Sequence, residues 1–256
     1  MAALQRDRWF VGAGLAAVVL VSWAYLLWME RAMYGMGPEC PMHNISAAWT
    51  PGYFWMTFAM WAIMMVAMMV PSAAPMVLTF ALVNRRRVPN ERAVVPAWIF
   101  LSGYIAAWTG FSLAATLLQW ALHAASLMAP ASLTVGPFLG GALLAAAGVY
   151  QWLPVKHACL SKCAGPLEFL VAEWREGRAG AWVMGFRHGL FCIGCCAVLM
   201  ILLFVAGVMN LLWIATLGGL VLVEKLLPAR RITVHAFGVL FLIAGIVLTG
   251  EAIWKQ

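Results

Sequence analysis

The chain has 256 residues, of which 65% are hydrophobic and only 10% are charged, and its mean hydropathy is +0.92. Near-continuous apolar runs of about 20 residues predict an all-α fold, a polytopic bundle of transmembrane helices in a lipid bilayer. They exclude a transmembrane β-barrel, whose strands alternate in hydropathy over about ten residues. The net charge of +7 would suit nucleic acid or acidic lipid. The positive residues gather on one side of the predicted spans, however, so no nucleic-acid partner is expected.

We predict seven spans within one integral membrane domain covering residues 1–256, at about 9–29, 51–83, 94–121, 135–153, 186–207, 209–226 and 232–252. The first run follows two arginines, as in a signal peptide, but no small-residue cleavage site follows it, so we expect an uncleaved span. With the N-terminus inside, 14 of the 16 lysines and arginines fall in inner segments. This bias predicts a cytoplasmic N-terminus and a C-terminus outside.

The first outer loop, residues 30–50, gathers soft metal ligands. Thioether, thiol and imidazole groups lie close together at Met33, Met36, Cys40, Met42 and His43. Such ligands suit monovalent copper, although a Gly/Pro-rich turn with incidental methionines would also account for them. Cys40 is the only cysteine predicted on the oxidising face, so it has no intrachain partner there.

The second span carries a stripe of methionines. The residues recur every four positions and are widened by two neighbours, giving Met56, Met60, Met64, Met65, Met68 and Met69. Methionine at helical spacing often only fills a core, but this stripe would run inward from the soft-ligand loop. Pro71 and Pro75 follow it and are expected to kink or interrupt the helix at membrane depth.

Five cysteines lie on the predicted inner side. Cys159 and Cys163 are four residues apart, on a short helix expected to open after Pro154. A second group stands at i, i+4, i+7 and i+8 and would share one helix face: His188, Cys192, Cys195 and Cys196.

Together the two groups predict a thiolate-rich metal site at the cytoplasmic end of the bundle, with His188 or the Cys159 and Cys163 pair completing the ligand shell. Two unrelated groups of buried cysteines remain the alternative. Cys195 and Cys196 diverge by about 100°, so one of them is expected to be a weaker ligand or a packing residue.

Two charged residues close the sixth predicted span. Lys225 is expected to extend to the lipid headgroups. Glu224 is expected to be a packed ion-pair partner rather than a proton carrier.

Three segments resemble a bacterial family catalogued as predicted metal-binding integral membrane proteins: WMTFAMWAIMMVAMMVPSAAP, YQWLPVKHACLSKC and GLFCIGCCAVLMILLFVAGVMNLLWIATLGGLVLVEK. The resemblance covers about residues 49–226. It implies the bacterial inner membrane as the location and a metal site that includes the matched sulfur residues, namely Met64, Met65, Met68, Met69, Cys159, Cys163, Cys192, Cys195 and Cys196.

The sequence favours a soft transition-metal protein that binds or translocates copper(I), because thioethers select that ion. Zinc or an iron–sulfur cluster could also use the thiolates. A metallochaperone or a partner membrane subunit would exchange the ion with it.

Two other interpretations stay open: a transmembrane thiol oxidoreductase, and a structural or assembly subunit whose cysteines and methionines only pack. The sequence contains no Ser/His/Asp set, phosphate-binding glycine loop or pair of intramembrane carboxylates. An enzyme is therefore less expected than a metal carrier.

Overall fold

The computed structural model describes residues 2–35, 49–87, 95–129, 133–227 and 230–254. Its helices are α1 (Ala2–Gly35), α2 (Pro51–Arg87), α3 (Ala97–Ala124), α4 (Pro137–Trp152), α5 (Pro154–Ala164), α6 (Pro166–Glu173), α7 (Gly177–Ile201), α8 (Leu203–Ala206), α9 (Leu211–Leu226) and α10 (Arg230–Trp254). Two short strands, β1 (Met128–Ala129) and β2 (Thr134–Val135), pair antiparallel between α3 and α4. The all-α prediction is confirmed.

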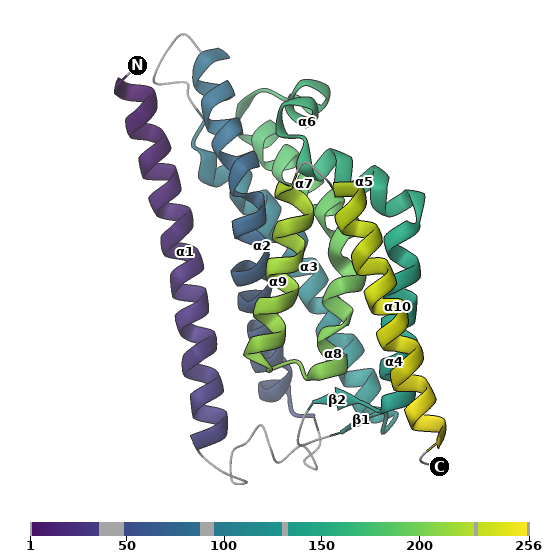
Figure 1. Ribbon diagram of the computed structural model, residues 1–256. Helices are drawn as coiled ribbons and strands as arrows, with labels where there is room; N and C mark the ends of the chain where they lie inside the picture. The colour runs from purple at the N-terminus through teal and green to yellow at the C-terminus, as the bar shows by residue number, and fades with distance from the viewer. Residues whose placement is uncertain (1, 36–48, 88–94, 130–132, 228–229, 255–256) are drawn as a thin grey trace.

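The helices form one elongated bundle (Figure 1). α1 lies along one side and the α4–α10 pair along the other, with α2, α3, α7 and α9 between them. The most apolar 18-residue stretch differs in burial between the long helices. Half of that stretch is buried in α2 and in α7 with α8, against 17% in α1 and 22% in α10. The outer helices thus turn apolar side chains outward, which suits contact with lipid, while α2 and α7 form the centre.

Five helices of the described part are long and apolar enough to span a membrane: α1, α2, α3, α7 with α8, and α10. The difference from the seven predicted spans lies in two places. α9 has only 16 residues, and α4 has 16 residues and meets α5 at a bend of 68°. The bend follows from Pro154, because a proline keeps the preceding residue out of the helical region, and Leu153 is extended.

α2 runs unbroken through Pro71 and Pro75, so the predicted interruption of this helix is wrong. Side-chain hydroxyls hydrogen-bond the backbone near both prolines: Ser72 Oγ donates to the Met69 carbonyl at 2.9 Å, and Thr79 Oγ1 donates to the Pro75 carbonyl at 2.7 Å. Such bonds help a membrane helix to tolerate proline. The helix ends in three arginines, Arg85, Arg86 and Arg87. Their positive charges stabilise the helix because they interact favourably with the negative C-terminal end of its dipole.

Glycines allow the central helices to approach closely. A Cβ on Gly103 of α3 would overlap the Trp182 carbonyl, and one on Gly185 of α7 would overlap the Phe100 carbonyl. Gly141 and Gly148 of α4 meet α10 in the same way. Small residues at such positions let membrane helices pack closely.

Candidate metal centre

Helix α7 places three cysteines in the bundle core. Cys192, Cys195 and Cys196 are at most 1% exposed. The Cys195 and Cys196 sulfurs are 3.2 Å apart, and the Cys195 thiol donates to the Cys192 carbonyl at 3.2 Å. The shared helix face predicted for these residues is therefore a buried face.

The short helix α5 adds a fourth thiol. Cys163 is buried and belongs to the same hydrophobic core as Cys192, Cys195 and Cys196. We call Cys163, Cys192, Cys195 and Cys196 the thiol cluster. The structure thus unites residues 29 or more positions apart in the chain.

Cys159, the fifth inner cysteine, lies on α5 beside the thiol cluster and is half-buried. Its Sγ is 2.6 Å from where a Cβ on Gly194 would stand, so only glycine lets α5 lie this close to α7. The Tyr150 hydroxyl donates to the Gly194 carbonyl and ties α4 to the same point.

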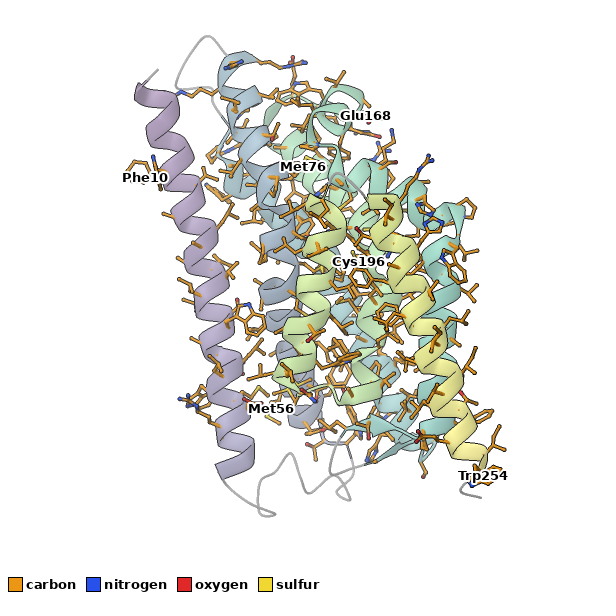
Figure 2. All side chains as sticks on the ribbon, viewed as in Figure 1. Phe10, Met56, Met76, Glu168, Cys196 and Trp254 are labelled. Atoms are coloured by element: carbon orange, nitrogen blue, oxygen red, sulfur yellow. The ribbon has the colours of Figure 1, made fainter. Side chains whose placement is uncertain are left out.

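The thiol cluster lies deeper than expected. Cys196 lies well inside the bundle, away from both ends (Figure 2). The sequence predicted the helix to begin at about residue 186, but α7 begins at Gly177. Cys192 therefore stands 15 residues, or about 22 Å, from the start of its helix.

His188 is buried one turn before Cys192, among aromatic rings. Its ring stacks on Tyr104 at 5.6 Å between centroids and meets Phe169 edge-on at 5.3 Å. Its Nδ1 has no hydrogen-bond partner among the described residues. The imidazole is four residues before Cys192 on α7, so it lies on the same helix face as the thiol cluster.

Lys225 is the residue that sequence reasoning placed wrongly. Instead of extending to the headgroups it is buried, and its Nζ donates to Cys192 Sγ at 3.0 Å and to Ser72 Oγ at 2.8 Å. The Tyr104 hydroxyl lies 3.2 Å from the same sulfur and donates to the Met69 carbonyl. Lys225 is the penultimate residue of α9, and a lysine so near a helix end ordinarily reaches the headgroups, so the sequence carried no local signal of its buried position.

The adjacent residue, Glu224, is a buried ion-pair partner, as predicted. Its Oε2 lies 2.8 Å from Lys156 Nζ, and its Oε1 accepts a bond of 2.9 Å from Gln151 Nε2. Since Lys156 belongs to α5, this pair fixes the helix that carries Cys163 against α9.

The methionine stripe of α2 joins the same core as the thiol cluster. Five of its side chains are at most 2% exposed, those of Met60, Met64, Met65, Met68 and Met69. Met56, at the end of the stripe, is exposed. Met68 packs at 3.5 Å from the position of a Cβ on Gly218 of α9. The stripe thus faces protein rather than lipid.

The remaining predicted ligands, Met36, Cys40, Met42 and His43, lie outside the described residues. Within the described ranges, no group of three or more His, Cys, Asp or Glu side chains is arranged to hold a metal ion. Two thiolates on one tetrahedral ion at about 2.3 Å would stand about 3.8 Å apart, further than the 3.2 Å between Cys195 and Cys196. The side chains are arranged as hydrogen-bonded thiols, so ligation would require some of them to turn.

These features define a helical bundle with membrane-length helices and a sulfur-rich core. The chain belongs to the PpoB2 family, described as copper chaperone, whose family model matches residues 58–248. The matched segment contains the whole thiol cluster, Lys225 and the buried methionines. No curated protein and no solved structure matches the chain.

Proposed function

We propose that the protein is a membrane-embedded copper(I) chaperone that holds its ion at the thiol cluster and exchanges it along the methionine stripe of α2. The observation that carries this proposal is the meeting of four buried thiols with five buried methionines in one core. Thiolate and thioether are the ligand types that select copper(I). Membership of a copper chaperone family supports the same ion over zinc or an iron–sulfur cluster.

Burial explains why the thiols suit storage of an ion. A bare thiolate inside a bundle is costly, and a bound cation offsets that cost. Burial of the sulfur atoms would also keep the bound copper(I) ion away from oxidants in water. A chaperone must release its copper ion as well as bind it. Because some thiols would have to turn to reach the ion, turning them back would release it.

We further propose that the protein lies in the bacterial inner membrane with its N-terminus in the cytoplasm. α5, α6 and the arginine-rich end of α2 lie at the end of the bundle where α1 begins (Figure 1). Met56 lies near the opposite end (Figure 2), so the stripe would lead inward from the outer face. A metallochaperone or a membrane subunit would exchange copper at one of these ends.

This orientation is tested by labelling single cysteines introduced at Glu168 of α6 and at Ala125 after α3, both exposed. With Cys40 replaced by serine in both variants, an impermeant thiol reagent applied to intact cells should modify Ala125→Cys and spare Glu168→Cys. The reverse pattern would invert the orientation.

The thiol oxidoreductase interpretation is less well supported. Disulfide exchange needs a thiolate that a partner can reach, and the four cysteines of the thiol cluster are at most 5% exposed. A purely structural role is the outcome that the metal measurement below would reveal.

The test is the copper content of protein purified in detergent under reducing conditions. Wild type loaded with copper(I) should retain it through desalting, and the variant with serine at Cys192, Cys195 and Cys196 should not. Cys159→Ser is the matched control, because it removes a neighbouring thiol outside the thiol cluster. Equal copper in wild type and the triple variant would show that these cysteines only pack.

A further inference from the structure

Among the described residues, no carboxylate pairs with the ammonium of Lys225. The buried pair Lys156–Glu224 and the pair Arg187–Glu173 do not involve Lys225. The nearest carboxylate along the chain, Glu224, is already bound to Lys156 and Gln151. Ser72 offers a dipole but no charge.

In the described part of the chain, the thiol cluster is the group in contact with Lys225 that can supply the missing negative charge. Lys225 Nζ lies 3.0 Å from Cys192 Sγ, and Cys163 and Cys196 are buried in the same core. A buried charge is tolerated when it is paired and hydrogen-bonded. The lysine therefore fixes how much negative charge the sulfurs of a loaded site should carry.

We infer that Lys225 is the counter-cation of a two-thiolate copper(I) centre. A copper(I) ion with two thiolates carries one net negative charge, which the ammonium cancels. With three thiolates the centre would keep one uncompensated negative charge in the core, where such a charge is costly. Lys225 is thus a positioning residue that sets the number of ionised ligands, and this inference rests on the proposed function.

The contacts also indicate which sulfurs these are. Cys192 is one, because it touches Lys225 directly. The second comes from Cys163 or Cys196, which are buried in the same core. Cys195 donates its thiol hydrogen to the Cys192 carbonyl and serves the others as a neutral neighbour. A two-coordinate ion of this kind needs no group of three ligands.

The experiment is a competition for copper(I) between the detergent-solubilised full chain and a chromogenic copper(I) chelator, without oxygen. Lys225→Met keeps the length of the side chain and removes its charge, while Lys225→Arg keeps the charge. The control is the double variant Lys156→Met with Glu224→Gln, which removes a buried lysine together with its own partner.

We expect Lys225→Met to bind copper(I) about thirtyfold more weakly or worse, as for a buried charge that loses its hydrogen-bonded partner. Lys225→Arg and the double variant should stay close to wild type. Unchanged affinity in a folded Lys225→Met protein would overturn the inference while leaving the proposed function intact. Failure of wild type to bind copper(I) would instead overturn the proposed function.

A second measurement does not depend on the folding of any variant. X-ray absorption at the copper edge of loaded wild type should give two sulfur neighbours at the short thiolate distance. Three or four such neighbours would overturn the assignment of Lys225.

Discussion

Two lysines are buried in the described part of this bundle, and they differ in the groups that they contact. Lys156 is held by the Glu224 carboxylate at 2.8 Å, which Gln151 also binds. Lys225 comes next to Glu224 in α9 but donates to a hydroxyl and a thiol. The first lysine belongs to a neutral pair that joins α5 to α9. The second lies against Cys192 of the thiol cluster, so we propose a structural role for Lys156 and a role in copper binding for Lys225.

The largest effect is expected from breaking the structural pair of Lys156 and Glu224. Glu224→Ala leaves the Lys156 ammonium buried without a partner, and we expect the free energy of unfolding to fall by about 3–5 kcal/mol. Denaturant unfolding in detergent, followed by circular dichroism, measures it. Adding Lys156→Met should restore most of the loss. A single variant as stable as the double one would contradict the account of this pair.

Breaking the other side should cost copper binding rather than folding. Cys192→Ser should weaken copper(I) binding by more than about a hundredfold. Loss of a residue that only supports a metal ligand costs up to about a hundredfold, and loss of a ligand itself should cost more. Cys195→Ser should have the smallest effect within the thiol cluster. Chelator competition measures both, and equal losses from the two variants would refute the ranking of these cysteines.

The close packing of α5 against α7 can be tested separately, because α5 carries Cys163 to the thiol cluster. Gly194→Ala would place a methyl group 2.6 Å from Cys159 Sγ, and overpacking of this kind costs about 1–3 kcal/mol. We expect lower thermal stability and weaker copper(I) binding together. Gly219→Ala is the matched control, since a Cβ there meets nothing within 4 Å. The idea fails if the two variants behave alike.

The smallest expected effect on stability comes from the methionine stripe. Replacing Met60, Met64 and Met68 with leucine conserves volume and should cost less than about 1.5 kcal/mol at each site. The copper tolerance of cells that depend on this protein should nevertheless change, because leucine offers no sulfur. If tolerance and copper occupancy both match wild type, the stripe serves packing only.

The sequence predicted the helices well and the site in part. Apolar runs and the i, i+4 spacing of Cys192 and Cys196 depend on local order, so they could be recognised along the chain. The burial of Cys163 in the same core as Cys192 depends on the bend at Pro154 and on the room that Gly194 leaves, and neither has a local signature. Lys225 was misplaced because a lysine near a helix end ordinarily reaches water, and only the packing of α2 and α7 around α9 closes that route.

The most direct test of the central claim is the position of copper in the folded protein. Crystals of the copper(I)-loaded chain, measured at the copper absorption edge, should give an anomalous peak within about 2.3 Å of Cys192 Sγ. The peak should lie in the thiol cluster beside Lys225. A peak found only outside the bundle core, with none at the thiol cluster, would contradict the account.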